Sequence, residues 1–296
     1  MAARMVISFS QSASVREAAL VTRAAPNLGL PTPPFDISAM SRRRELGLFL
    51  RSRREGLTPE AVGLATGLRR RALGLRREEV AELAGISVDW YTRLEQGRVG
   101  SPSTHTLDAL ARALHLAPAE YAHLQLLIQP HSAPAVPAQR IPAALARVVE
   151  QWQYPSYVVN ERWDLLAWND AAAAVFGDFG GQPGECANLL RYMLLDETAQ
   201  QVFGDTWAEE AQRMVGKFRR LYDQHAGSKA FDALIGDLND ASACFVTWWQ
   251  RHDIISQGTG RKHLRDQSGI LRAFEYLSMH PADAPQLRLA LYMPVA

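Results

Sequence analysis

The sequence predicts an α+β protein in which an N-terminal bundle of helices is followed by a domain with an antiparallel sheet. Residues 75–128 show the apolar periodicity of short helices, separated by glycines and opened by helix-capping residues. A segment rich in proline and alanine at 130–137 then marks a linker. Beyond it, short strand-like runs at both ends enclose several helical segments.

Composition excludes several classes of protein. The chain has 296 residues, of which 47% are hydrophobic and 21% charged, so it is neither disordered nor fibrous. Its two cysteines, Cys186 and Cys244, form no Cys-x-x-Cys pair, which excludes a disulfide framework and a cysteine-rich zinc site. No run approaches the roughly 18 apolar residues of a membrane helix. We therefore expect no membrane association and a cytoplasmic location.

Basic side chains are concentrated near the N-terminus. Seventeen basic and twelve acidic residues precede Pro130, whereas fifteen basic and nineteen acidic residues follow it. Between Ser41 and Arg77 there are eleven arginines and three glutamates. This excess suits a phosphate-rich partner such as double-stranded DNA, although a solvated arginine face would have the same composition.

Two short helices joined by a tight turn form the central motif. The segment Leu75–Ala84 has a helical apolar face, Gly85 can adopt the positive φ of a turn, and Ser87 can cap the next helix. In that second helix Tyr91 and Leu94 can face the core, which leaves its other side chains free to enter a DNA groove. Further helices are predicted from Thr104 or Thr106 onward and from Pro118 to about Ile128.

The predicted DNA contacts are of two kinds. Side chains on the outer face of the second helix would read base edges, and arginines at the start of the first would contact phosphates. Trp90 is more simply explained as a packing residue. The predicted DNA-binding residues are Arg76, Arg77, Ser87, Val88, Asp89, Thr92, Arg93 and Arg98.

These residues resemble known families. Ala81-x-x-Ala-Gly-x-Ser87 followed by Leu94-Glu-x-Gly97 resembles the phage-repressor-type (XRE) helix-turn-helix, and the resemblance implies that Glu95 pairs with Arg54 or Arg53 of helix one. The segment Leu57–Leu64 also reads like the start of such a motif but lacks its turn and its ending, so it is interpreted as part of an insertion that includes Arg69–Arg71. With this insertion, the motifs at 42–51, 75–81 and 88–97 resemble the MmyB-like regulators.

The second half predicts a sheet with helices between its strands. Pro142 opens a helix, strands are expected at 156–160 and 163–168, and Asn169 caps a helix ending at Gly177. Helices near 187–195, 207–225, 229–238 and 241–251 and strands near 259–266, 270–279 and 286–293 follow. In the last strand, leucines alternate with Arg288, Ala290 and Tyr292, which predicts a sheet with one buried face and the helices on one side.

This half resembles the ligand-binding domain of the MmyB-like regulators, which has a PAS-like fold. The motifs are Tyr157-Val-Val, Leu166-Ala-Trp-Asn169, Asn188-Leu-Leu-Arg191, Trp248-x-x-Arg-His-Asp253 and the final strands; Asp266-Gln-Ser-Gly269 departs from the family's turn. The resemblance implies an apolar pocket for a hydrophobic small molecule, with a long-chain fatty acid as the expected occupant. The predicted apolar lining is Trp168, Phe176, Leu190, Met193, Met214, Phe218, Leu221, Phe245, Trp248 and Leu277.

A carboxylate head group needs a cation or hydrogen-bond donor at such a pocket. The donors clustered in these motifs are Arg191, Arg251 and His252, and His252 is equally well explained as a satisfied core histidine. Each apolar lining residue can also be ordinary core.

No catalytic motif accompanies this organisation. The sequence has no Gly-x-Gly-x-x-Gly, Walker loop, Gly-x-Ser-x-Gly or His-Glu-x-x-His, and Asp178-Phe-Gly180 lacks the other kinase motifs. We expect a non-enzymatic protein without metal or cofactor. Two alternatives stay open: a haem- or flavin-binding sensor or small-molecule enzyme attached to a DNA anchor, and a protein-interaction module.

The predicted organisation has four parts. Residues 1–40 form a disordered arm or a misassigned start before Met40, 41–130 a helix-turn-helix domain, 131–141 a linker, and 142–296 a PAS-like ligand-binding domain. The expected function is transcription regulation by a homodimer whose DNA binding responds to the ligand.

Overall fold

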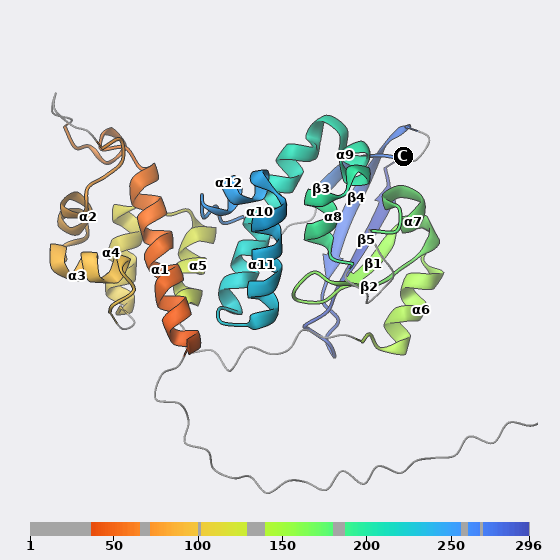
Figure 1. Ribbon diagram of the computed structural model, residues 1–296, viewed down its shortest axis with the longest axis horizontal. Helices are drawn as coiled ribbons and strands as arrows, with labels where there is room; N and C mark the ends of the chain where they lie inside the picture. The colour runs from red at the N-terminus through yellow and green to blue at the C-terminus, as the bar shows by residue number, and fades with distance from the viewer. Residues whose placement is uncertain are drawn as a thin grey trace, which may run out of the picture. The chain divides into compact units, whose positions relative to one another are not determined.

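The computed structural model describes residues 37–65, 72–99, 102–128, 140–179, 187–255, 260–266 and 269–295 (Figure 1). Residues 1–36 of the predicted arm, Arg69–Arg71 and residues 131–139 of the predicted linker lie outside these ranges. Within them, the fold is the predicted α+β arrangement: a helical N-terminal region followed by a domain with an antiparallel sheet.

The N-terminal region is a bundle whose helices begin and end where the capping residues predict. Gly85 has a φ of 66° and ends the second helix, and the Ser87 hydroxyl accepts a hydrogen bond from the Trp90 backbone N–H at the start of the third. The first helix begins at Ile37, inside the predicted arm. The elements are α1 (Ile37–Gly56), the 3-10 helix η1 (Glu60–Val62), α2 (Arg77–Ala84), α3 (Val88–Glu95), α4 (Thr104–Ala113) and α5 (Pro118–Ile128).

One apolar core holds these helices together. Phe49 and Leu50 of α1 and Tyr91 and Leu94 of α3 are buried in it, as the periodicity predicts. The segment Leu57–Leu64 forms only η1 and a turn, which confirms that it is not the start of the helix-turn-helix.

Gly47 lets α1 and α3 approach closely. A Cβ atom at this position would lie 2.2 Å from the backbone oxygen of Glu95, at the end of α3. Backbone atoms cannot move aside as a flexible side chain can, so only glycine allows this helix crossing.

The C-terminal domain has a five-stranded antiparallel sheet in the order β2-β1-β5-β4-β3. Five predicted strands are confirmed, with small changes at their ends. They are β1 (Ser156–Val159), β2 (Leu165–Trp168), β3 (Gly260–Arg265), β4 (Leu271–Met279) and β5 (Arg288–Pro294). Asp266 and Gly269 lie between β3 and β4, in the segment whose sequence departs from the family's turn. Gly269 has a φ of 82°, and its backbone N–H donates to the Asp266 oxygen.

Seven α-helices accompany the sheet in the part of the domain that the structure describes. They are α6 (Ala143–Gln151), α7 (Asp170–Phe176), α8 (Leu189–Leu195), α9 (Glu197–Phe203), α10 (Trp207–Gln224), α11 (Lys229–Ala241) and α12 (Ala243–Trp249), with the 3-10 helix η2 (Gly204–Thr206). Helix α9 and η2 were not predicted. With only seven residues, α9 is too short for its periodicity to stand out, and its start is marked only by the Asp196 cap.

The prediction of a sheet with one buried face is wrong. In the central strand β5, residues 288–292 are all buried. Leu289 and Leu291 pack with α6 on one face, whereas Ala290 and Tyr292 belong to the larger core formed with α7–α12 on the other. Helices therefore cover both faces, with α6 across the sheet from α10 and α11 (Figure 1). An alternating pattern marks two environments, and here the second environment is also protein rather than water.

No helix among the described residues is both long and apolar enough to cross a membrane.

The Gly47 contact predicts a specific sensitivity. We expect Gly47→Ala to lower the free energy of unfolding by about 3 kcal/mol, because the new methyl group forces the backbones of α1 and α3 apart. Urea denaturation followed by circular dichroism measures this change. The matched control is Gly56→Ala at the exposed end of the same helix, where no atom lies within 4 Å; its effect should stay within about 0.5 kcal/mol. Equal stabilities of the two variants would contradict the tight crossing.

Candidate DNA-binding surface and ligand cavity

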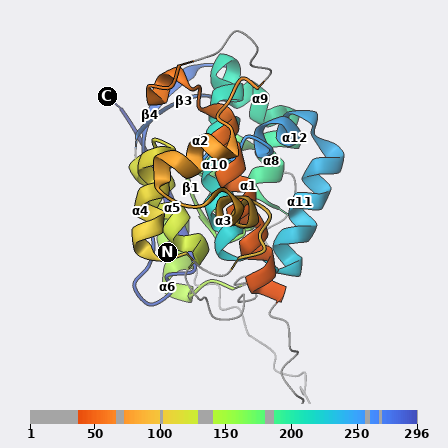
Figure 2. The same ribbon diagram turned by 90° about the vertical axis from the view of Figure 1, so that its left-hand side faces the viewer.

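Helix α3 presents a polar outer face. Val88, Asp89 and Arg93 are exposed and Thr92 is half-buried, while Tyr91 and Leu94 fill the core on the other side. The side chains of Asp89 and Arg93 are 82% and 57% exposed, and their charged atoms lie 3.9 Å apart. Helix α3 lies on the side of the bundle that faces the viewer in Figure 2.

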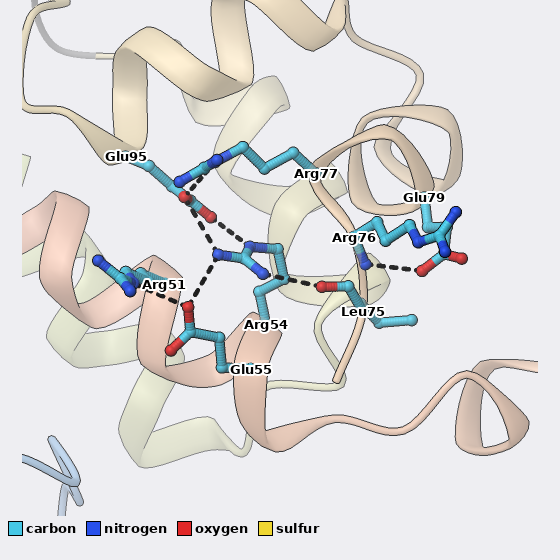
Figure 3. Close-up of polar contacts among 8 residues, drawn as sticks. All are labelled: Arg51, Arg54, Glu55, Leu75, Arg76, Arg77, Glu79 and Glu95. Atoms are coloured by element: carbon cyan, nitrogen blue, oxygen red, sulfur yellow. Dashed lines mark hydrogen bonds and ion pairs between the residues drawn. The ribbon is translucent and has the colours of Figure 1, made fainter. Parts of the chain in front are cut away.

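A buried carboxylate fixes the end of α3. Arg54 of α1 donates from Nε to Glu95 Oε1 at 2.5 Å, and Arg77 of α2 donates from Nε to Glu95 Oε2 at 2.7 Å (Figure 3). Arg54 also donates from Nη1 to the backbone oxygen of Leu75 at 2.8 Å. Of the two partners that the resemblance left open for Glu95, the structure selects Arg54. One carboxylate thus joins the three helices that position the outer face of α3.

These contacts determine the protonation of Glu95. Burial by itself would raise the pKa of this carboxyl group, but hydrogen bonds from Arg54 and Arg77 outweigh the burial and hold its pKa below the ordinary value. Glu95 is therefore ionised at neutral pH, and its charge is balanced by the two arginines.

The predicted phosphate contacts differ in their surroundings. Arg77 is half-buried and bound to Glu95, so its guanidinium helps to position α3. Arg76 and Arg98 are exposed, and the backbone N–H of Arg76 donates to the Glu79 carboxylate at the start of α2. The hydroxyl of Ser87 is used as the α3 cap. The eight residues remain predicted DNA contacts.

The C-terminal domain contains a cavity of about 380 Å³ between the sheet and its helices. This volume lies in the range of small-molecule sites, roughly 300–1,000 Å³. Most of the wall is aromatic or apolar. The lining residues of this kind are Tyr157, Trp163, Phe176, Phe179, Leu189, Tyr192, Met193, Phe203, Met214, Tyr276 and Tyr292.

Basic and polar side chains occupy another part of the wall. Lys217 on α10, Lys262 on β3 and Arg288 on β5 line the cavity together with Ser278 and His280. Lys262 is paired with Glu210, and the Arg288 guanidinium lies 4.8 Å from the centre of the Trp163 ring. Among the described residues no carboxylate lies within 4.0 Å of the Lys217 ammonium. Burial, together with the nearby charge of Lys262, lowers the pKa of Lys217.

Three tyrosines of the sheet, Tyr157, Tyr276 and Tyr292, line the cavity. Tyr157 on β1 and Tyr292 on β5 have hydroxyl oxygens 3.4 Å apart, and the Tyr276 and Tyr292 rings are 5.1 Å apart. Burial raises the pKa of Tyr157 and of Tyr292, so both phenols are neutral at physiological pH. They can donate or accept hydrogen bonds but supply no charge.

Two residues of the wall have unusual backbone conformations. Trp163 and Phe179 have φ values of 66° and 49°, in the left-handed region that side chains with a Cβ rarely adopt. The Trp163 ring packs edge-on against Phe218 at 5.2 Å, and Phe179 lies 5.2 Å from Phe176. The surrounding core thus holds two strained residues against the cavity, as is frequent at binding sites.

The predicted apolar lining is distributed over three places. Phe176, Met193 and Met214 line the cavity. Leu190, Phe218 and Phe245 are buried in the same core without lining it, and Trp168, Leu221 and Trp248 pack against that core. Leu277 packs with α6 on the opposite face of the sheet, because neighbouring positions of β4 point to opposite sides.

The predicted head-group donors do not line the cavity, so their assignment is corrected. Arg191 lies at the surface and pairs with Asp237. Arg251 and His252 follow α12 and contact α1, since their backbone oxygens accept hydrogen bonds from Arg53. Burial lowers the pKa of His252 to about 3, so its imidazole is neutral and buried, in line with the alternative of a core histidine.

Sequence reasoning missed the basic part of the wall. Arg288 and Tyr292 were interpreted as the outer side of β5, but their face lines the cavity together with Ser278 of β4. One signal was available: three of the strands each carry one tyrosine, Tyr157, Tyr276 and Tyr292, where a solvated face would carry charged residues. Lys217 carries no such signal, because only the packing of α10 against the sheet turns it inward.

No metal centre is formed by the described residues, among which no three His, Cys, Asp or Glu side chains cluster as ligands.

Comparisons with protein families match both halves of the chain. Residues 141–296 match the family described as MmyB-like transcription regulator ligand binding domain. Residues 45–124 match the family described as helix-turn-helix domain. The first description refers to ligand binding, and the second names the helix-turn-helix. The search of curated proteins finds no match.

The Glu95 contacts predict a pH dependence. Since the folded-state pKa of Glu95 is lowered, its stabilisation is present above the ordinary carboxyl pKa and is lost as the pH falls through the folded value. Glu95→Gln should lower the free energy of unfolding at pH 7 by roughly 2–4 kcal/mol and flatten its decline below about pH 5. Urea denaturation at a series of pH values measures both effects.

The matched control is Glu82→Gln, on the exposed side of α2. It should keep the stability and pH profile of the unsubstituted chain. A Glu95→Gln profile that runs parallel to the control would mean that the ion pairs contribute nothing.

Proposed function

The chain belongs to the MmyB-like transcription regulators, and from this premise we propose that it is a homodimeric, sequence-specific DNA-binding regulator whose cavity binds a long-chain fatty acid. The observation that carries the proposal is the cavity wall: it is apolar along most of its surface and basic at Lys217, Lys262 and Arg288. A fatty acid has the same two parts. In this proposal the protein catalyses no reaction and uses no metal or cofactor.

The wall fits an alkyl carboxylate in charge and shape. Aromatic rings and the Met193 and Met214 side chains adapt to a flexible chain, since thioethers are themselves flexible and polarisable. A carboxylate beside Lys217 offsets the cost of burying this ammonium, whose lowered pKa reflects that cost. Neutral Tyr157 and Tyr292 can add hydrogen bonds without repelling the anion.

The DNA partner is supported by the exposed face of α3. Arg93 can donate two hydrogen bonds to a guanine edge and Val88 can contact a thymine methyl group. Arg76 and Arg98 are exposed and suit phosphate oxygens. Helix-turn-helix proteins commonly read two half-sites about 34 Å apart as dimers, which is the arrangement proposed here.

The ligand proposal predicts an effect of Lys217. Native mass spectrometry of the purified protein, followed by extraction, should release a fatty acid from a dimer. Lys217→Met should weaken the binding of hexadecanoate about tenfold or more, because a charge-assisted hydrogen bond is lost while the apolar contacts remain.

Arg191→Met is the matched control, because Arg191 is a surface arginine of the same domain that does not line the cavity. Its hexadecanoate affinity should be unchanged. A coloured cofactor in the extract, or equal affinities of the two variants, would contradict the proposed ligand.

The DNA proposal predicts different roles for two arginines. Arg93→Ala should abolish the preference for the specific site, with a loss of roughly 1–3 kcal/mol that is absent on random DNA. Arg76→Ala should weaken the binding of all sequences and lower the dependence on salt. Fluorescence anisotropy with a selected operator and with random duplex DNA at several salt concentrations separates the two effects. The roles would be wrong if both variants lost the same factor on both duplexes.

A further inference from the structure

Helix α10 contacts both the ligand cavity and the helical region that carries the candidate DNA-binding surface. One turn of it, at Met214 and Lys217, lines the cavity, and the next turns carry the buried side chains Arg219 and Asp223. These two side chains point toward the DNA-binding region rather than into the cavity. Residues Phe35–Ala296 form one compact unit, so the contacts between the two regions are part of the fold.

The contacts of Arg219 and Asp223 with α1 and α5 are polar and buried. The Arg219 guanidinium pairs with Glu45 of α1, and Asp223 Oδ2 lies 3.0 Å from His123 Nε2 of α5. Arg219 Nε and Asp223 Oδ2 are 3.4 Å apart, which joins the two pairs into one cluster. All four side chains are at most 11% exposed. Opening this cluster would leave charges buried without partners, so it holds α10 in one arrangement against α1 and α5.

A second set of contacts lies beside this cluster. Arg53 of α1 donates from Nη2 to the backbone oxygens of Arg251 at 2.7 Å and His252 at 3.0 Å. A few residues later Ile255 packs on α10, where a Cβ atom at Gly216 would lie 3.0 Å from its side chain. The segment after α12 is therefore held between α1 and the cavity turn of α10.

The cavity wall and the cluster are also joined through packing. Trp163, which lines the cavity, packs edge-on against Phe218, the residue that precedes Arg219 on α10. The cavity wall is thus connected to Glu45 through two consecutive residues of α10, Phe218 and Arg219. Glu45 lies on α1. This helix crosses α3 at Gly47, and its Arg54 donates a hydrogen bond to Glu95.

We propose that the cluster of Glu45, Arg219, Asp223 and His123 transmits occupancy of the cavity to the DNA-binding helices. The proposal rests on the ligand binding proposed above. A ligand that moves or rigidifies the Met214–Lys217 turn changes the free energy of the cluster, and the cluster changes how α1 holds α3. Coupling of this kind is reciprocal, so DNA must change the affinity for the ligand by the same factor.

The test is a thermodynamic cycle on the full chain. DNA affinity is measured with and without hexadecanoate, and hexadecanoate affinity with and without DNA. In the unsubstituted protein we expect the two ratios to be equal and at least about fivefold. In Glu45→Gln/Arg219→Met both ratios should fall to one, while the affinity for each ligand alone changes less than about threefold. Glu45→Gln by itself keeps a hydrogen-bonding side chain and should lower the ratios partly, which provides a milder variant if the double substitution does not fold.

The matched control is Glu209→Gln, which removes the exposed ion pair of Glu209 with Arg213 on the same helix. It should keep the ratios of the unsubstituted protein. A folded Glu45→Gln/Arg219→Met variant with undiminished ratios would overturn the proposal, and so would equal loss in the control.

A readout without ligand separates this proposal from that of the fatty acid. Hydrogen–deuterium exchange of the unliganded Glu45→Gln/Arg219→Met variant should increase in α1 and also in the Met214–Lys217 turn, whereas the control variant should not change. If hexadecanoate fails to bind the unsubstituted protein, the fatty-acid proposal is wrong and the exchange result still decides the coupling. Increased exchange confined to one side of the cluster would contradict transmission between the regions.

Discussion

Burial of strand β5 on both faces is the constraint on which the C-terminal domain depends. When helices cover both faces of a sheet, the side chains on each face of its central strand must pack against protein rather than water. Leucines at 287, 289 and 291 satisfy the α6 side, while Arg288, Ala290 and Tyr292 face the larger core. An arginine and a tyrosine on that inner face prevent complete apolar packing. The cavity lies at these polar positions.

The DNA-binding region is organised around one carboxylate in a comparable way. Glu95 is buried at the end of α3, and it is tolerated there because Arg54 and Arg77 donate to both of its oxygens. Arg54 belongs to α1 and Arg77 to α2, so these two ion pairs connect α3 to both helices. The outer face of α3 thus takes its orientation from ion pairs beneath it, and its exposed side chains are left for recognition.

Helices α1 and α10 connect these two arrangements. Helix α1 meets α3 at Gly47 and Arg54 and meets α10 at Glu45, while α10 meets the cavity at Met214 and Lys217. Both helices use charged side chains in buried positions, where geometry is strict because an unpaired charge is costly. Buried charge pairs of this kind therefore have few alternative arrangements. For this reason they can distinguish a ligand-bound from a ligand-free state of a regulator.

The sequence by itself determined the order and ends of most elements, because caps and turns are local: Gly85, Ser87, Asn169 and Pro118 act within a few residues of themselves. It also determined the core face of α3 through periodicity. The resemblance narrowed the partner of Glu95 to Arg54 or Arg53, and the structure selected Arg54 and added Arg77. Only the tertiary structure decided which face of β5 lines a cavity, because both faces alternate with the same period. It likewise turned Lys217 inward and brought Arg219 to Glu45, because these contacts depend on how distant helices pack.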